Sequence, residues 1–177
     1  MNIGLKRGTV ELAEWDEGFA VSAREIIRTL KNILKDDAVD IQHIGSTSIR
    51  GIKAKPIIDI VVGVRDFNDM SKYNAELEEA GIYYRKQDVP DQQLYVVGEG
   101  EYRTHHIHTV IYGSSGWNNY INFRDYLNQR PEIAFQYSQL KEDLVKEFAT
   151  DRGAYTKAKQ EMIDDILKKA EIWRQID

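Results

Sequence analysis

A single acidic residue lies inside a short apolar run at residues 57–64, which reads IIDIVVGV. A run of β-branched residues this short is typical of a central strand buried on both faces. Asp59 would lose hydration there, so it needs a metal ion, a cation or several hydrogen-bond donors as partners. We predict that it is a metal ligand, the alternative being that it pairs with Lys53, Lys55 or a backbone turn.

The segments around this strand alternate between the periodicities of helices and strands. The segment VDIQHIGS, residues 39–46, is expected to form a strand that stops at a tight turn at Gly45. Two further strands, IYYRK and QLYVVG, are joined by a loop containing Pro90. A last strand spans residues 104–112, and helices are expected over residues 15–35, 67–80, 117–128, 131–148 and 152–172. The order predicts an α+β fold in one domain: a mixed β-sheet core flanked by helices over residues 1–112, with a C-terminal helical extension over 113–177.

Composition excludes several classes of protein. Hydrophobic residues make up 42% of the 177 residues, which argues against disorder, and no stretch approaches the ~18 apolar residues of a membrane span. The net charge of −5 argues against broad nucleic-acid binding. The chain has no cysteine and no signal-peptide pattern at its N-terminus, so we expect a cytoplasmic protein without thiolate chemistry.

Phosphate-binding candidates begin with the turn Gly45-Ser46, which directly follows a strand. A glycine lets the backbone approach a ligand closely, and a turn at a strand end can aim N–H groups at a phosphate. Lys55, Arg103 and Lys159 are candidate cations for the same ligand. Most Gly-Ser pairs are only turns, however, and most lysines on helices are solvated.

Two histidines, His106 and His108, alternate with Ile107 on the last predicted strand. Side chains at i and i+2 project from the same face, so both imidazoles can reach one ion. Neutral imidazole suits zinc, manganese, iron or nickel better than magnesium. The alternative is one histidine satisfied in the core and another facing solvent.

The segment IQHIGSTSIRGIKAKPIIDIVVGV resembles the signature of the GrpB family. The resemblance extends to VELAEWDEGF, RTHHIHTV, NFRDYLNQRPEIAFQYSQLK and DRGAYTKAK, and so covers nearly the whole chain. It implies the fold of the nucleotidyltransferase superfamily typified by polymerase beta. In active members of that superfamily, a glycine-serine turn holds the triphosphate, and carboxylates on two strands hold two divalent ions about 3.5–4 Å apart.

The chain departs from that pattern at its metal site. Asp59 is present, but Val61 stands where the second carboxylate is expected, and the later strand offers His106 and His108 instead of an acid. The remaining set is Asp59, His106, His108 and His43. It is suited either to one divalent ion (magnesium, manganese or zinc) or to a proton relay by neutral histidines near pH 7.

Three functions remain open on these residues. The first is a metal-dependent nucleotidyltransferase-like protein acting on a nucleotide or small phosphorylated substrate, with Asp59, His106 and His108 as catalytic residues. The second is an inactive module of the same fold that binds a nucleotide, a CoA-type ligand or a protein. The third is a hydrolase or lyase using a metal-activated water, which ranks last because no nucleophile–base arrangement is visible.

Overall fold

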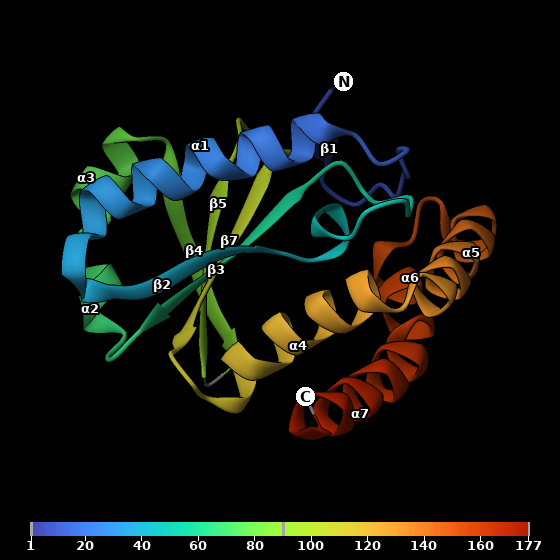
Figure 1. Ribbon diagram of the computed structural model, residues 1–177. Coiled ribbons are helices and arrows are strands. Elements are labelled where there is room, and N and C mark those ends of the chain that lie inside the picture. The colour runs from blue at the N-terminus through green and yellow to red at the C-terminus, as the bar shows by residue number, and fades with distance from the viewer. Residues whose placement is uncertain (1, 90, 177) are drawn as a thin grey trace.

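The protein is a mixed β-sheet covered by helices, as the sequence predicts (Figure 1). The computed structural model describes residues 2–89 and 91–176, with the backbone alone at residues 86–89. Five strands form the main sheet in the order β2-β3-β7-β5-β4, in which only the β3–β7 pair is parallel. Their bounds are β2 (Ala38–Ile44), β3 (Ile58–Val64), β4 (Ile82–Val89), β5 (Gln92–Val97) and β7 (His105–Ile111).

Helix α1 (Glu17–Leu34) covers one face of this sheet (Figure 1). It begins at Asp16, whose side chain accepts a hydrogen bond from the Gly18 N–H and so satisfies one free donor of the first turn. Its buried side chains meet every second residue of β3, and the resulting core includes Phe19, Leu30, Ile58, Ile60 and Val62. The alternation of β3 therefore sends Asp59 and Val61 to the opposite face.

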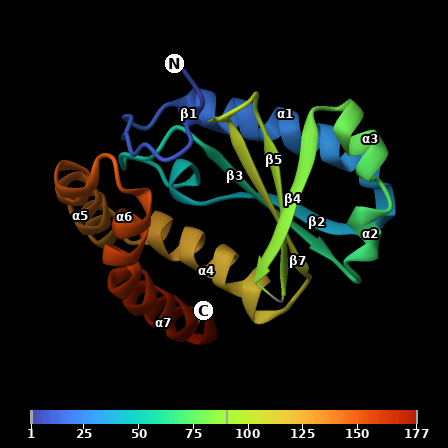
Figure 2. The ribbon, with the colours of Figure 1, turned by 180° about the vertical axis from the view of Figure 1, so that it is seen from behind.

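The opposite face is covered by α4 (Ser115–Gln129), whose Trp117 packs with Val61 and Val110. Helices α5 (Pro131–Phe148), α6 (Arg152–Ala158) and α7 (Gln160–Ile176) gather beyond one end of the sheet (Figure 2). A second apolar cluster joins α4, α5 and α7 to the connection between β2 and β3. No helix within the described residues is both long and apolar enough to cross a membrane.

The expected helix over residues 67–80 is wrong as one element. It forms two short helices, α2 (Asn68–Ser71) and α3 (Asn74–Glu79). The break falls where Lys72 and Tyr73 both turn to Asp37, at 2.8 Å each, so contacts with α1's C-terminal region override local helix propensity. Gly81 has a φ of +76° and ends the segment, as expected.

The last expected helix is also divided. Lys159 ends α6 and α7 starts at the next residue. The chain also contains a two-residue ladder between β1 (Leu5–Lys6) and β6 (Tyr102–Arg103), which is too short to leave a periodic pattern. The predicted loop position at Pro90 lies outside the described residues.

Candidate functional site

The parallel pairing of β3 with β7 brings the predicted metal ligands together. Asp59 lies opposite His106, and Val61 lies opposite His108. Residues in register on neighbouring strands point to the same face, so these side chains all project toward the side covered by α4. The Asp59 Oδ1 atom is 3.4 Å from His106 Nδ1 and 3.3 Å from His108 Nε2.

The geometry of this group fits one metal ion. One ligand atom from each of the three residues lies within 4.8 Å of the others. Two donors that each lie about 2.1 Å from a tetrahedral zinc ion are themselves about 3.4 Å apart, close to the two distances from Asp59. Those distances are at the long end of the range for N–H···O hydrogen bonds, so the imidazoles make weak hydrogen bonds to the carboxylate.

The position of the missing carboxylate is apolar. Val61 has no exposed surface and packs with Ile44, Val110 and Trp117. A two-magnesium arrangement needs a second acid at this position, so the residues present do not fit it, while the Asp59, His106 and His108 set fits a single ion that accepts nitrogen ligands.

The ionisation of Asp59 supports a ligand role. Burial disfavours its charged form, but hydrogen bonds from His106 and His108 outweigh burial and lower the pKa of Asp59 below its ordinary value. The carboxylate is therefore charged at neutral pH and available to a cation.

Gly45 makes room for this carboxylate. Its φ is +70°, and a Cβ built on it would lie 2.5 Å from Asp59 Oδ2 and 2.9 Å from Asp59 Cβ. The turn after β2 thus lies directly against Asp59, and only a residue without a side chain fits there. Ser46 follows at the start of a short 3-10 helix (Ser46–Ser48).

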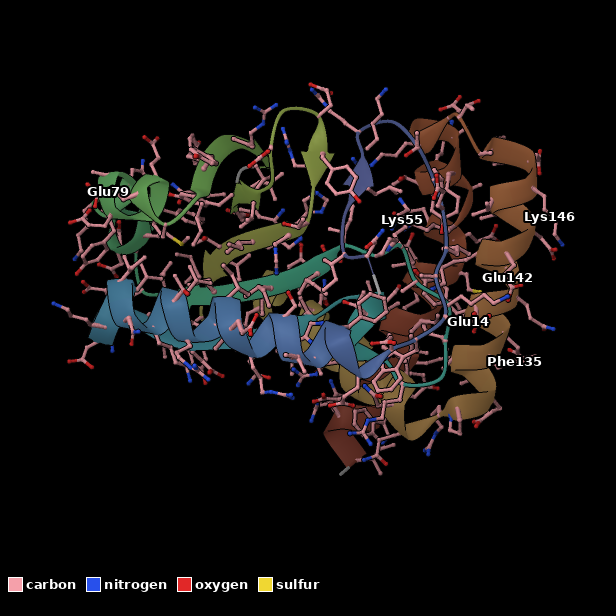
Figure 3. The ribbon with its side chains drawn as sticks, turned by 90° about the horizontal axis from the view of Figure 1, so that it is seen from above. Glu14, Lys55, Glu79, Phe135, Glu142 and Lys146 are labelled. Atoms are coloured by element: carbon pink, nitrogen blue, oxygen red, sulfur yellow. The ribbon has the colours of Figure 1, made fainter. Side chains whose placement is uncertain are left out.

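A cavity of about 220 Å³ opens beside Asp59 and His106, and we call it the lysine cavity. Four of its lining residues are cations, contributed by the β2–β3 connection, α5 and α6, and Figure 3 shows Lys55 where the sheet meets the C-terminal helices. Asp59 is its one acidic lining residue. The lining includes Ser46, Thr47, Lys55, Ile57, Asp59, His106, Lys141, Arg152, Tyr155, Thr156 and Lys159.

The lysines of this cavity are poorly stabilised as cations. Burial, followed by the charges of Lys159 and Arg152, lowers the pKa of Lys55 to about 7. Burial, followed by the charges of Lys159 and Lys55, lowers the pKa of Lys141 to about 7. The pKa of Lys159 is lowered in the same direction, again chiefly by burial. An anion in the cavity would reverse these effects, because it would supply the missing counter-charge.

Tyr155 forms one wall of the lysine cavity. The Lys55 Nζ atom lies 4.5 Å from the centre of its ring, and the Lys159 Nζ atom lies 5.1 Å away. Its side chain is fully buried, and its hydroxyl has no hydrogen-bond partner among the described residues. A buried hydroxyl without a partner beside a cavity is suited to a polar ligand.

A second cavity of about 280 Å³, the aromatic cavity, lies on the other side of Asp59. It shares Ser46, Asp59 and Lys159 with the lysine cavity. Its distinctive lining is apolar and aromatic, and it includes Gly45, His108, Tyr120, Phe123, Tyr137, Ile163 and Leu167.

Two predicted site residues lie apart from these groups. His43 pairs in register with Ile60, which faces α1, and its Nε2 atom lies 2.9 Å from the Thr47 hydroxyl, so it is not part of the ligand group. Arg103 does not line the lysine cavity. Its guanidinium donates to the carbonyls of Gly100 and Tyr102.

The alternative partners considered for Asp59 are engaged elsewhere. The Lys53 Nζ atom lies 3.3 Å from Glu14 and 2.9 Å from Glu142, two acids labelled in Figure 3. Lys55 lies over the Tyr155 ring rather than in an ion pair with Asp59.

Sequence reasoning missed Lys141 and Arg152. Lys141 is 2% exposed. It lies three or four residues from buried residues of α5, and so on the same buried face of the helix as Ala134, Tyr137 and Leu144. A lysine on the apolar face of an amphipathic helix was the available signal, because such a residue needs a special environment. Arg152 had no comparable signal.

The fold defines the structural class of this protein. It resembles the Cid1 poly(U) polymerase solved with MgGTP bound, with a TM-score of 0.53 and 13% identity over 75% of this chain and 44% of that one. A cytoplasmic RNA terminal U-transferase gives the same TM-score at 13% identity, over 78% of this chain and 41% of that one. The chain therefore has a nucleotidyltransferase-like fold.

The chain belongs to the GrpB family. The family model described as "GrpB protein" matches residues 9–169. The chain is 36% identical to the glutamate-rich protein GrpB of Alkalihalophilus pseudofirmus, over 94% of this chain and 99% of that protein. It is similar to the crystal structure of GrpB from Enterococcus faecalis, with a TM-score of 0.85 and 29% identity over 92% of this chain and 99% of that one. The family resemblance seen in the sequence is thereby confirmed.

Proposed function

We propose that this protein is a metal-dependent nucleotidyltransferase that binds a nucleoside triphosphate in the lysine cavity and transfers its nucleotidyl group to a second molecule. The observation that carries the proposal is the arrangement of Lys55, Lys141, Arg152 and Lys159 around one cavity whose floor is Asp59 and His106. Four cations facing a single carboxylate favour a ligand with several negative charges. A triphosphate meets that requirement.

Each part of the site has a role in this reaction. The turn at Gly45 and Ser46 approaches the phosphates, and the lysines neutralise them. The aromatic cavity is suited to the nucleobase because Phe123 and Tyr120 provide flat apolar surfaces beside it. Asp59, His106 and His108 would hold one divalent ion, manganese or zinc, which supplies positive charge for the phosphate oxygens.

The transfer itself is a displacement at phosphorus. An oxygen of the second molecule bonds to the α-phosphorus while the bond from that phosphorus to the bridging oxygen breaks. Pyrophosphate leaves, and the proton of the attacking hydroxyl is released to water. Lys55 and Lys141 stabilise the departing pyrophosphate, because its extra charge develops beside them.

The fold neighbours support the nucleotide part of this proposal. One is a Cid1 poly(U) polymerase solved with MgGTP, and another is the same enzyme with the UTP analogue UMPNPP. These proteins resemble this chain in fold alone. The proposal of a nucleoside triphosphate as the substrate therefore rests on the cations of the lysine cavity.

A second candidate is a binding module that holds a nucleotide without transferring it. The burial of Val61 favours it, because the apolar packing around Val61 removes one of the carboxylates used by two-ion enzymes. Release of pyrophosphate distinguishes the two candidates, since only the transferase produces it.

Calorimetry with Mn²⁺ or Zn²⁺ and nucleoside triphosphates tests the proposal. We expect one ion per chain in the wild type and no measurable ion binding in Asp59→Asn. The control is Asp143→Asn, which makes the same change at an exposed acid paired only with Lys146. An unchanged ion affinity in folded Asp59→Asn would reject the metal site, and bound nucleotide without pyrophosphate release would favour the binding module.

A further inference from the structure

A third cavity, which we call the arginine cavity, lies on the far side of the histidine pair. Its volume is about 450 Å³, and four arginines line it: Arg7, Arg85, Arg103 and Arg152. Its remaining lining residues are Gln92, Leu94, Val96, His106 and His108, so no carboxylate is among them.

The sheet forms the floor of the arginine cavity. In the β5–β7 ladder, Leu94 lies opposite His108 and Val96 lies opposite His106. These four side chains lie on the central strand β7 and its neighbour β5, and they share the face that carries Asp59. The cavity is therefore a continuation of the candidate active site along the same face.

The arginines reach this floor from four separate parts of the chain. Arg103 belongs to β6, and its pairing with Leu5 of β1 brings the segment containing Arg7 to the same edge. Arg85 comes from β4, the edge strand seen in front in Figure 2, and Arg152 comes from α6. Convergence of four cations from distant segments on one cavity is not a consequence of local sequence.

The charges in this cavity are available to a ligand. Among the side chains that the structure describes, those of residues 2–85 and 91–176, no ion pair involves Arg7, Arg85, Arg103 or Arg152. Arg103 is 8% exposed, and carbonyl groups fix its guanidinium in place. A planar guanidinium held in a fixed orientation suits the paired oxygens of a phosphate better than a flexible lysine does.

Two lining residues, His106 and Arg152, are common to the arginine and lysine cavities. Ligands in the two cavities would therefore meet beside His106 and Arg152. This is the relation required between a donor and an acceptor, because the attacking oxygen must come within contact distance of the phosphorus.

We propose that the arginine cavity binds the second substrate of the transfer reaction, a small molecule that carries at least one phosphate group. The inference rests on the proposed function and adds the chemical class of the acceptor. A small phosphorylated molecule fits better than a nucleic-acid strand, because the cavity is limited in volume and the chain as a whole carries a net charge of −5.

Calorimetric titration with inorganic pyrophosphate tests this inference on the full chain. The wild type is expected to show two binding events. In the double variant Arg7→Gln/Arg85→Gln, one event should weaken roughly tenfold or more, since each lost charged contact with phosphate is worth about one power of ten. In Lys55→Gln/Lys159→Gln, the other event should weaken instead.

The matched control is Arg28→Gln/Arg130→Gln, which removes two exposed arginines outside the three cavities. It should leave both events unchanged. Arg7 and Arg85 are themselves exposed, so their variant should unfold at the temperature of the wild type.

The outcomes separate the inference from the function on which it rests. Two events that survive Arg7→Gln/Arg85→Gln unchanged would overturn the inference alone. If no pyrophosphate-binding event of the wild type is weakened by Lys55→Gln/Lys159→Gln, the proposed function is overturned. A ten-nucleotide single-stranded RNA that binds more tightly than pyrophosphate, and loses that affinity in the arginine variant, would replace the small acceptor with a nucleic acid.

Discussion

Asp59 and Gly45 occupy adjoining space at the centre of the site. Asp59 requires a partner because it lies in an apolar strand, and it has two imidazoles on one side and the Gly45 backbone on the other. The glycine is therefore part of the mechanism that positions the carboxylate. This single contact couples the proposed phosphate-binding turn to the proposed metal ligand.

We predict that Gly45→Ala abolishes ion binding. The new methyl would lie 2.5 Å from Asp59 Oδ2, which is too close for a non-bonded contact, so we expect the carboxylate to rotate away from His106 and His108. The control is Gly51→Ala, where φ is +77° and a Cβ would meet nothing within 4 Å. Both variants should lose about 1–2 kcal/mol of unfolding free energy from the left-handed backbone, but only Gly45→Ala should lose the ion.

Calorimetry with Mn²⁺ and urea denaturation measure the two effects separately. Equal ion affinities in the two glycine variants would show that Asp59 is not held in place by the turn.

The parallel pairing of strands β3 and β7 brings the proposed metal ligands Asp59, His106 and His108 together. The sequence was sufficient to place Asp59 on a buried strand and to put His106 and His108 on one face of another, because both conclusions follow from alternation. It could not supply the register between the two strands, which are separated by two helices and three strands. The family resemblance filled that gap.

His43 was predicted to be a metal ligand because the sequence does not reveal the register between β2 and β3. A shift of one residue reverses the face of every side chain on a strand. His43 lies opposite Ile60, and its neighbour Ile44 lies opposite Asp59, so the histidine points away from the ligand group. The divided helix at residues 67–80 also depends on a distant group, since the contact of Tyr73 with Asp37 lies at the break between α2 and α3.

We predict that Val61→Asp destabilises the protein by on the order of 3 kcal/mol, because the new carboxylate would be buried beside Asp59 among apolar side chains. The same change at Val21, which is 42% exposed on α1, should cost less than about 1 kcal/mol. Urea denaturation compares the two. A Val61→Asp variant as stable as the wild type would mean that the site has room for a second carboxylate, and hence for two ions.

Across the whole molecule, the site depends on segments that are far apart in sequence. The sheet supplies the floor, the β2–β3 connection supplies Lys55, and α5 and α6 supply Lys141, Arg152 and Lys159. Asp59 lines both the lysine and the aromatic cavity, and the arginine cavity shares His106 with the first and His108 with the second. The arrangement concentrates positive charge in one part of a protein whose net charge is −5, as the proposed binding of a phosphorylated ligand requires.

This concentration of charge predicts a dependence of stability on pH. Lys55 and Lys141 lose their protons at about pH 7 in the folded protein, whereas an unperturbed lysine has a pKa of 10.5. The unfolded chain therefore binds more protons between these values, and the contribution of these lysines to the unfolding free energy rises with pH across that window. Burial is the largest cause of the lowered pKa of Lys55. Lys159, directly after α6, and Arg152 of α6 lower it further, and Asp59 of β3 raises it.

Urea denaturation at a series of pH values above 7, in buffer free of phosphate, checks this dependence. The unfolding free energy should rise less steeply with pH in Lys55→Met than in the wild type. Pyrophosphate should stabilise the protein most at the lowest pH of the series, where the lysines are charged. A slope that Lys55→Met leaves unchanged would show that Lys55 keeps an ordinary pKa in the folded state.

The central claim is that Asp59, His106 and His108 hold one divalent ion at the floor of the lysine cavity. The most direct measurement is anomalous X-ray diffraction from crystals grown with Mn²⁺ or Zn²⁺ and a non-hydrolysable nucleoside triphosphate analogue. The account predicts one anomalous peak within bonding distance of Asp59 Oδ1, His106 Nδ1 and His108 Nε2, with phosphate density among the lysines. An ordered analogue bound elsewhere, with no peak between the carboxylate and the two imidazoles, would contradict it.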